Sequence, residues 1–568
     1  MSVRPASSLV LLAIGAAAAT HVRAQAPAPF ELHVSVRFDQ AELDEARIAR
    51  LRAAGFQVDL LSTSVPWSGE VAGPAADPAQ LALLKKRLGR GFSWSAFDPA
   101  ALAQNDMTFP KVVPPELAAW CDRLSARDAQ GSDALVRWVR ALEPVAAIGS
   151  LALQSPRPGD GVDLERIVPE LDFFAASSVG AARELVRGLA RAGVRELGAI
   201  RIEAAADVGV DLDDHVSHGA RGVWLGPVED VDDGGRLTEF AKAIVAARDA
   251  LGSARDAFAG ATIQHDPIWI VESRESSWVQ GVLDREADGS TSRRTRESWV
   301  RLVQDIGFQP CLVPLSQLSD RIGNRPPNLL ILPAVLVMSE EEAEGIRTFV
   351  RAGGCVLADY GVGAYDERFR LRDVPALDDL FGITRHEDGE RLVHSGRGSD
   401  SHRLDTGVAV AETGVSADIG EPTAAGAMVH CEHEVGDGCA VFWNLAACEY
   451  VDLRTDPSRV TAASDLRARL SRVLLGDANT RPVISVHGSG LPRCLETVRL
   501  ESRAGEHLLA VRLNAIGAPD LLRVLAERGP KPVRLMFPTE VQLRDLRTGE
   551  DLGRGREFER TLAPNVAM

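Results

Sequence analysis

The middle of the chain carries the stretch that decides its fold: Leu329-Leu-Ile-Leu-Pro333, then Ser339-Glu-Glu-Glu342, then Gly353-Gly-Cys-Val-Leu-Ala-Asp-Tyr360. The first and last runs are short, continuous and apolar, which is typical of strands buried on both faces of a parallel sheet. Between them Ser339 is a helix N-cap, with acidic residues in the first turn where the helix dipole favours them. Strand, helix and strand in this order predict a flavodoxin-like or Rossmann-like unit.

The same unit continues upstream of this stretch. Ile268-Trp-Ile-Val271 predicts a buried strand, and the helix predicted for Arg294 to Ile306 ends at Gly307. Strands that alternate with helices imply parallel pairing through crossover connections. We assign residues 266–475 to this middle domain.

Residues 30–255 show the same alternation of strand and helix. A helix predicted for Ala41 to Ala54 ends at Gly55, and another begins at Gly180. Because about 220 residues is near the lower limit for a (β/α) barrel, the pattern predicts a short or degenerate TIM-type barrel. The stretch from about 67 to 132 does not divide into clear elements. The predicted strands are Glu31 to Phe38, Phe56 to Leu61, Val145 to Leu153, Leu171 to Ala175, Leu197 to Ile202 and Gly222 to Leu225.

After about residue 480 the pattern changes to short strands separated by turns. Examples are Thr497 to Leu500, Leu508 to Leu513 and Val541 to Leu546. We predict a small β-sandwich over residues 480–568. The fold class is therefore α/β, with a barrel, a flavodoxin-like middle domain and a β-rich C-terminal domain.

Residues 1–24 have the pattern of an export signal. Arg4 precedes an apolar run from Leu9 to Ala19, which is too short to span a bilayer, and Val22-Arg-Ala24 fits a cleavage site. The alternative is an uncleaved anchor. No later segment has about 18 uninterrupted apolar residues, so we expect a secreted or periplasmic protein with no membrane contact after cleavage.

Composition and charge exclude several classes of protein. The 568 residues are 45% apolar and 25% charged, the ordinary globular balance. With 63 basic and 80 acidic residues, the formal net charge is −17. A surface this negative repels phosphate backbones, so nucleic acid is not expected as a partner.

The seven cysteines do not form a disulfide framework, because their number is odd and their spacing wide. Cys311 and Cys355 lie in apolar runs and are expected to be buried thiols. In an oxidising compartment Cys439 could bond to Cys431 or to Cys448, and the sequence does not decide between these partners.

Three segments of the middle domain resemble a known family. The run from Leu329 to Tyr360, the later Val374-Pro-Ala-Leu-Asp-Asp-Leu-Phe-Gly-Ile383 and the upstream Trp269-Ile-Val-Glu-Ser-Arg-Glu-Ser-Ser-Trp278 resemble the trimerisation domain of family 42 β-galactosidases. The order of the three domains is also similar. The resemblance implies a glycosidase-like barrel, a glutamine-amidotransferase-like middle domain and a homotrimer. Cys355 follows Gly-Gly at the start of a strand, which is not the sharp turn that a nucleophilic cysteine needs.

Glycoside hydrolysis needs two carboxyl groups, which project from the carboxyl ends of barrel strands. Glu203 follows the apolar run Gly198 to Ile202, and the later His218-Gly-Ala-Arg-Gly-Val-Trp224 resembles the strand that follows the nucleophile in the family. On that resemblance Glu203 is the catalytic nucleophile. The alternative is a charged strand end without a catalytic role.

The second carboxyl group is not evident. The family places an Asn-Glu pair where this chain has Gln154-Ser155, and glutamine cannot act as a general acid. Three acids are possible substitutes: Asp160, Asp172 and Glu229. Glu229 follows a predicted strand and is also a candidate substrate-binding residue, although a solvated surface loop is the more common explanation of such an acidic stretch.

Three tryptophans are candidates for a platform on which sugar rings stack: Trp67, Trp94 and Trp224. Core packing is the alternative for each of them. No metal or cofactor is expected. His430-Cys-Glu-His433 is too crowded for usual zinc spacings, and the polar run Asp211 to Asp214 is expected to be a solvated loop or a helix start.

Two functional hypotheses follow from these residues. The first is a secreted glycoside hydrolase of β-galactosidase type that acts on a carbohydrate. The second is a catalytically inactive protein that keeps the fold to bind glycan or to assemble. The missing glutamate at position 155 favours the second, whereas export and domain order favour the first.

Overall fold

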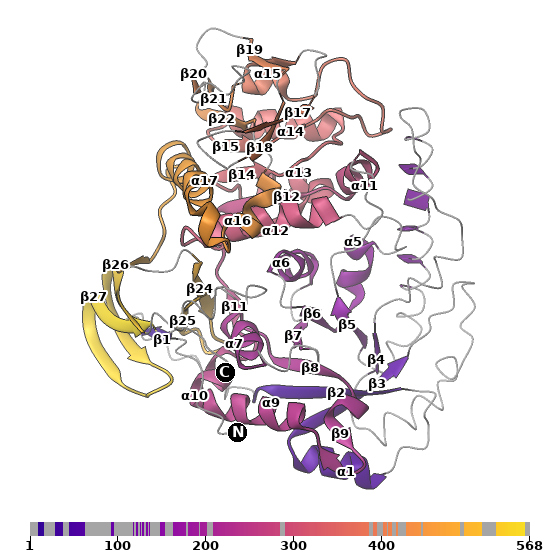
Figure 1. Ribbon diagram of the computed structural model, residues 1–568, viewed down its shortest axis with the longest axis vertical. Helices are drawn as coiled ribbons and strands as arrows, with labels where there is room; N and C mark the ends of the chain where they lie inside the picture. Colours follow the sequence, from indigo (N-terminus) through magenta and orange to yellow (C-terminus); the bar gives the residue numbers. More distant parts are fainter. Residues whose placement is uncertain are drawn as a thin grey trace.

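The computed structural model divides into three parts, a barrel, a middle sheet and a C-terminal sheet (Figure 1). Figure 1 draws the barrel below the middle sheet, with the hairpin of the C-terminal sheet at the left. The structure describes residues 10–15, 29–37, 45–62, 92–95, single positions between 118 and 136, 148–153, 163–177, 180–191, 194–200, 208–283, 290–385, 390–394, 401–405, 407–411, 416–418, 428–444, 447–488, 494–513 and 530–562.

Seven of the described strands pair in chain order, each parallel to its neighbours, and the first also pairs with the last. The ladder therefore closes on itself, and the predicted parallel α/β arrangement is confirmed. One strand, β4, lies in the stretch that the sequence did not divide. The strands are β2 (Glu31–Arg37), β3 (Phe56–Ser62), β4 (Phe92–Ser95), β5 (Ile148–Leu153), β6 (Phe173–Ser177), β7 (Arg195–Ala199) and β8 (Gly222–Pro227).

Alternate residues of the barrel strands face two different environments. Leu32 and Val34 of β2 belong to the large core that contains residues of the outer helices, as do Val223 and Leu225 of β8. The residues between them face the interior of the barrel. The helices that follow barrel strands include α1 (Glu45–Ala53), α6 (Gly180–Leu189), α7 (Val208–Ser217) and α9 (Glu239–Ala250).

The middle sheet has the strand order β13-β12-β14-β15-β22-β21-β20. The first strand in sequence therefore lies between the second and the third, which is the flavodoxin-like order. The first five strands of this sheet order are parallel, and β21 and β20 are antiparallel additions. The strands are β12 (Ile268–Glu272), β13 (Cys311–Pro314), β14 (Leu329–Leu332), β15 (Cys355–Ala358), β20 (Ser416–Asp418), β21 (His430–Val435) and β22 (Gly438–Trp443).

The stretch that decided the fold adopts the predicted structure. Leu329 and Ile331 of β14 enter the large core on one face of the sheet, and Leu330 and Leu332 enter a second core on the other. The helix after β14 is α14 (Glu340–Arg351), and its capping box is complete. The hydroxyl of Ser339 accepts a hydrogen bond from the amide of Glu342 at 3.2 Å, and the Glu342 carboxylate accepts one from the Ser339 amide at 2.8 Å.

The C-terminal domain differs from the predicted β-sandwich. Its described strands form one antiparallel sheet rather than two facing sheets. The sheet uses its second face to pack on the barrel, because Leu508 and Ala510 of β25 belong to the large core. Alternation of apolar residues predicts the strands but not the layer that covers them. The sheet comprises β23 (Ser485–His487), β24 (Leu495–Glu501), β25 (His507–Leu513), β26 (Lys531–Asp545) and β27 (Asp551–Leu562), together with β11 (Thr262–Ile263) and β1.

Strand β1 (Val10–Gly15) comes from the predicted export signal and pairs with β25 and β26. Cleavage of residues 1–24 stays a prediction. Among the residues that the structure describes, none of the helices has both the length and the apolar character needed to cross a membrane.

A single apolar core connects the three parts. It contains Leu32 of the barrel, Ile268 of the middle sheet and Leu508 of the C-terminal sheet, all buried. We therefore expect the three parts to unfold together rather than as separate domains.

Gly438, the first residue of β22, gives a test of the packing in the middle domain. A Cβ atom there would lie 2.2 Å from the carbonyl oxygens of both Gly354 and Val350. We expect Gly438→Ala to lower the free energy of unfolding by about 1–3 kcal/mol, because the backbone must shift. Urea denaturation measures this loss.

Gly476→Ala is the matched control, because a Cβ atom at Gly476 meets nothing within 4 Å. Its free energy of unfolding should stay within about 0.5 kcal/mol of the wild type or rise slightly. Equal effects of the two substitutions would contradict the close approach at Gly438.

Candidate functional site

The rim at the carboxyl ends of the barrel strands is the predicted site. Strand β7 ends at Ala199, and the amide of Ile200 donates to the Trp224 carbonyl of β8 at 2.9 Å. Helix α7 begins at Val208. Glu203 itself lies outside the described residues, in the segment that joins β7 to α7, so its catalytic role stays a prediction.

The acids considered as catalytic partners of Glu203 differ in where the structure places them. Gln154, Ser155 and Asp160 lie outside the described residues. Asp172 precedes β6 and binds Arg191 through Oδ1 at 2.8 Å. It therefore lies at the amino end of a barrel strand, opposite the rim where catalytic groups project, and we withdraw it as a substitute for the acid.

Glu229 lies at the predicted rim, in α8 (Val228–Val231), directly after β8. Its side chain is 48% exposed, and Oε1 lies 4.0 Å from Nη1 of Arg47. Arg47 also binds the buried Asp232 through Nε at 2.7 Å. Glu229 is thus a solvent-facing carboxylate beside an arginine, and its contact with a substrate stays a prediction.

The three tryptophans do not form a described cluster. Trp67 lies outside the described residues, and Trp94 lies on β4 with only its backbone described. Trp224 is 7% exposed, and it packs inside the barrel against Phe173, Ala175, Leu197 and Ala199. This is the placement of a core side chain, the alternative that the sequence left open.

Sequence reasoning missed a polar pair inside the barrel. His33 aligns with Trp224 across the β2–β8 ladder, and its Nε2 lies 3.0 Å from Oε2 of Glu31. Both side chains are buried, and Arg221 Nη2 lies 3.4 Å from Glu31 Oε1. The alternation of Glu31 and His33 with apolar residues was the available signal, since it places two polar groups on one strand face.

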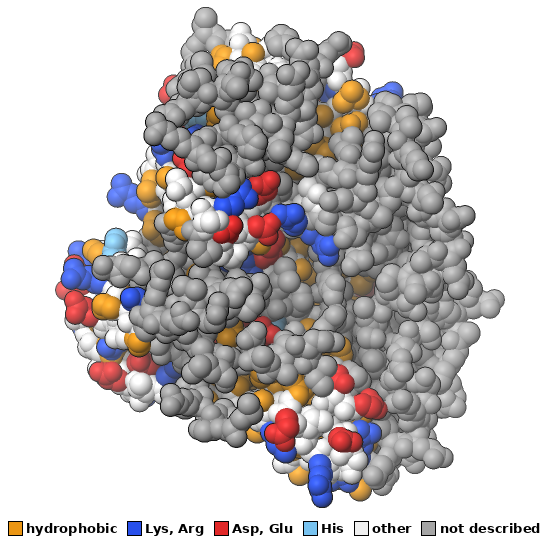
Figure 2. Space-filling view, viewed as in Figure 1, with side chains coloured by type: hydrophobic (Ala, Val, Ile, Leu, Met, Phe, Trp, Pro, Cys, Tyr) orange, Lys and Arg blue, Asp and Glu red, His pale blue; other side chains and the backbone are white. Residues whose placement is uncertain are grey.

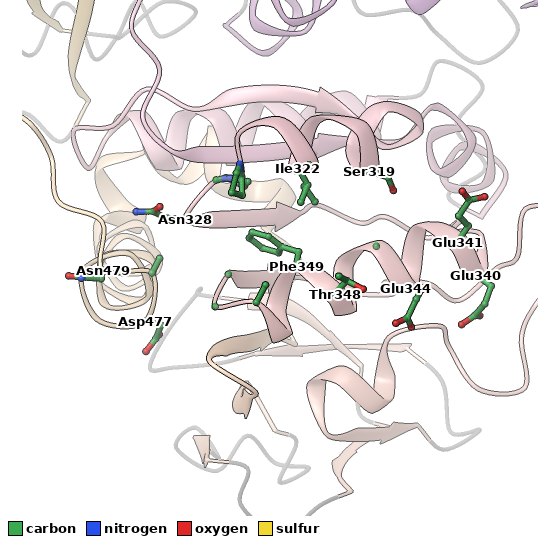
Figure 3. Close-up of a pocket in the computed structure, with 18 residues that line it drawn as sticks. Ser319, Ile322, Asn328, Glu340, Glu341, Glu344, Thr348, Phe349, Asp477 and Asn479 are labelled. Atoms are coloured by element: carbon green, nitrogen blue, oxygen red, sulfur yellow. The ribbon is translucent and has the colours of Figure 1, made fainter.

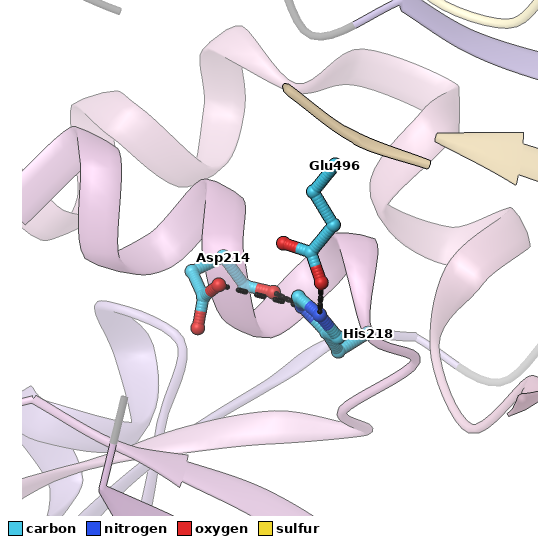
Figure 4. Close-up of side chains that lie close together, drawn as sticks. All are labelled: Asp214, His218 and Glu496. Carbon is cyan, nitrogen blue, oxygen red and sulfur yellow. Dashed lines mark hydrogen bonds and ion pairs between the residues drawn. The ribbon is translucent and has the colours of Figure 1, made fainter. Parts of the chain in front are cut away.

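A second polar cluster begins on α7, and Asp211 lies in the first turn of this helix, so the helix start, one of the two expected alternatives, is confirmed. Asp214 is fully buried within the helix, not solvated, and so are its neighbours Asp213 and His215. The cluster comprises Asp214, His218 and Glu496 of β24, and Figure 4 shows the two ring nitrogens of His218 directed at oxygen atoms of the other two residues. Nδ1 lies 2.8 Å from the Asp214 carbonyl and Nε2 lies 2.9 Å from Glu496 Oε1.

Arginines balance the negative charge of this cluster. Arg183 of α6 donates to Asp214 Oδ2 at 2.5 Å, and Arg512 of β25 binds Oδ1 of the same carboxylate. Burial opposes the charged form of Asp214, but the two guanidinium groups outweigh it and hold the pKa of this carboxyl well below its usual range. Burial likewise opposes ionisation of Glu496, but His218 and Arg512 lower its pKa to about 2.

The cluster has the residue types of a metal site, because one atom of each of its three members lies within 4.8 Å of the others. However, two guanidinium groups already contact its carboxylates. A further cation would have to displace them in a fully buried setting. We therefore interpret the cluster as an ion network that joins the barrel to the C-terminal sheet.

A groove of about 1110 Å³ runs between α13 (Leu318–Asn324) and α14 in the middle domain (Figure 3). Ile322 and Phe349 give it an apolar floor, and Figure 3 shows Glu340, Glu341 and Glu344 along one end. The groove runs along the outer side of the helices, and its other end, lined by Asn328, Gly353 and Gly354, lies at the amino ends of β14 and β15. Ligands of parallel sheets bind at the carboxyl ends, so this groove is not the expected place for chemistry.

The surface carries charges of both signs. On the face in Figure 2, acidic and basic side chains are interspersed over the hairpin β26–β27 at the left and over the region of α1 and α9 at the bottom. Arg534 of β26, for example, lies 3.8 Å from Glu557 and 3.5 Å from Glu559 of β27. Among the described residues on this face, no large basic patch offers a surface to nucleic acid.

The chain matches no protein-family profile and no curated protein sequence. Solved structures do match. A catalytic mutant of Gan42B, a GH42 β-galactosidase from G. stearothermophilus, aligns at 14% identity and a TM-score of 0.59 over 94% of this chain and 98% of that chain. The β-galactosidases of Bacillus circulans sp. alkalophilus and Halorubrum lacusprofundi align at 11% and 12% identity, with TM-scores of 0.57 and 0.56, over 95% of this chain and 99% of theirs.

The ion network gives a prediction for the site region. We expect Glu496→Gln to lower the free energy of unfolding by about 3–5 kcal/mol, because it removes one charge from a buried, paired set. Arg534→Gln is the control, since this exposed arginine makes surface pairs worth at most about 1 kcal/mol. Urea denaturation at neutral pH measures both.

The acid limb of the stability curve tests the same assignment. The pKa of Glu496 falls from an ordinary 4.5 to about 2 in the folded protein, so its stabilising contribution is present above pH 4.5 and is lost as the pH falls through 2. The variant should lack this component between these two values. Parallel acid limbs for wild type and variant would refute the ion network.

Proposed function

Because the chain has the fold of GH42 β-galactosidases, we propose that it is an exported glycoside hydrolase that acts on a β-linked galactoside or a similar glycan. The observation that carries the proposal is the match over nearly the whole chain, from the barrel through the middle sheet to the C-terminal sheet. Three connected parts in the same order are a stronger similarity than a barrel alone, since barrels support many chemistries.

In this proposal Glu203 is the nucleophile of a retaining mechanism. It follows β7 in the sequence by four residues, and the segment after the carboxyl end of a barrel strand is where such carboxylates belong. Attack on the anomeric carbon breaks the glycosidic bond, and the leaving oxygen takes a proton from the acid. Water then hydrolyses the glycosyl-enzyme. Glu229, at the rim and solvent-facing, is proposed to contact the sugar and is a candidate for the acid.

A second candidate function is glycan binding without hydrolysis. The observation that favours it is the pair Gln154-Ser155, where the family resemblance expects an acid. A barrel without a proton donor retains a carbohydrate site but loses most of its rate. Assembly into a homotrimer, which the resemblance also implies, fits either function, and light scattering on the purified chain tests it, with a monomer at micromolar concentration contradicting it.

Hydrolysis of a panel of aryl glycosides separates the two functions. We expect turnover by the wild type and a loss of roughly a thousandfold or more in kcat for Glu203→Gln, because the nucleophile is removed. Glu229→Gln is the comparison variant at the same rim. A rise in its KM alone would assign it to sugar binding, and a fall in its kcat would assign it to proton transfer.

Absence of turnover on every sugar, from protein whose circular dichroism and unfolding curve show that it is folded, would contradict the hydrolase proposal. Binding on a glycan array by the same preparation would then support the second function. Equal kcat values for wild type and Glu203→Gln would remove Glu203 from the mechanism.

A further inference from the structure

The disulfide partners considered for Cys439 are not the residue that the structure places beside it. Cys431 and Cys439 are both free thiols. Across the β21–β22 ladder Cys431 aligns with Phe442, whereas Glu434 aligns with Cys439. The candidate bridge from Cys439 to Cys431 is therefore absent, because strand register, not sequence separation, decides which side chains meet. The side chain of Cys448 lies outside the described residues, so the other candidate stays a prediction.

The residue beside Cys439 is Cys355. Strands β15 and β22 are parallel neighbours, and Cys355 aligns with Cys439 in their ladder. Residues aligned in this way point to the same face of the sheet. The packing agrees, because Cys355 is a member of the large core and Cys439 packs against that core from a partly buried position.

The two thiols also interact with each other. The Cys439 thiol, together with burial, raises the pKa of the Cys355 thiol well above its ordinary value. The Cys355 thiol is therefore not held as a thiolate, which a nucleophile or a metal ligand would require. Nucleophilic catalysis and metal binding therefore do not explain Cys355.

We propose that Cys355 and Cys439 form a disulfide bond when the folded protein meets a small disulfide oxidant. Adjacent strands lie about 4.8 Å apart, within the range of about 4.4–6.8 Å that Cα atoms of bonded cysteines occupy. The reaction balances by exchange: two protein thiols and one oxidant disulfide give one protein disulfide and two oxidant thiols. No other described cysteine has a cysteine as its ladder partner.

The groove of Figure 3 passes close to the amino end of β15, although neither cysteine is among its lining residues. Gly353 and Gly354, which directly precede Cys355, line the groove together with Asp477. Asp477 is also close enough to the Cys355 thiol to contribute to raising its pKa. An oxidant in the groove would therefore lie near the amino end of β15, where the buried Cys355 begins the strand.

The bond would join two neighbouring strands of the middle sheet, β15 and β22, which are separated in the chain by residues 359–437. A crosslink that closes a loop of this length restricts the unfolded chain and stabilises the folded one. Export to an oxidising compartment, which the leader predicts, is where such a bond would persist. The proposal concerns the thiols alone and does not depend on glycosidase activity.

The test compares full-length protein kept in reductant with the same protein treated with oxidised glutathione, both folded and during refolding from urea. After alkylation in denaturant with N-ethylmaleimide, digestion without reductant and mass spectrometry should reveal a peptide pair linked through Cys355 and Cys439. Two fewer thiols should be alkylated, and the urea midpoint should rise.

Cys355→Ser and Cys439→Ser should each abolish the linked peptides and the shift in urea midpoint, whereas Cys431→Ser should preserve both. If both thiols are alkylated after both treatments in protein that remains folded, the proposal is wrong. Linkage of either cysteine to a different cysteine would also overturn it.

Discussion

The relative placement of the barrel and the C-terminal sheet depends on one buried carboxylate. Asp214 of α7 binds Arg183 from the barrel layer on one oxygen and Arg512 from β25 on the other, and all three side chains are fully buried. Such charges are stable in the interior only when the whole set is assembled, since each one left alone would cost several kcal/mol. The network therefore favours the docking in which Arg512 of the C-terminal sheet reaches Asp214.

The same constraint extends toward the predicted catalytic segment. His215, one residue after Asp214, lies so close to β7 that a Cβ atom at Gly198 would fall 2.1 Å from its ring. Burial lowers the pKa of this histidine to about 3, so it adds no further positive charge to the cluster near neutral pH. Strand β7 and helix α7 are thus fixed against each other, and the chain that contains Glu203 connects these two fixed ends.

The sequence predicted elements with strong local patterns and missed those that depend on distant partners. Leu329–Leu332 is apolar at every position, so its burial on both faces follows from the run itself. Asp214 gives no such signal, because its partners Arg183 and Arg512 lie 31 and 298 residues away. The same distinction holds for the candidate site. The rim position of Glu229 could be predicted from the strand just before it, whereas the burial of Trp224 depends on contacts with β6 and β7.

The middle domain shows why a similar fold does not imply the same catalytic residues. Cys355 begins β15, so it lies at the amino end of the parallel sheet, whereas catalytic groups of such sheets lie at the carboxyl ends. The residue just past the carboxyl end of β15 is Asp359, which accepts hydrogen bonds from the Trp299 indole at 2.8 Å and from the Ala334 amide. Burial raises the pKa of this carboxyl to about 7. Asp359 therefore connects the carboxyl ends of β14 and β15 to α12 (Ser290–Gln304) through hydrogen bonds. The position that a nucleophile would occupy in such a sheet has a structural role here.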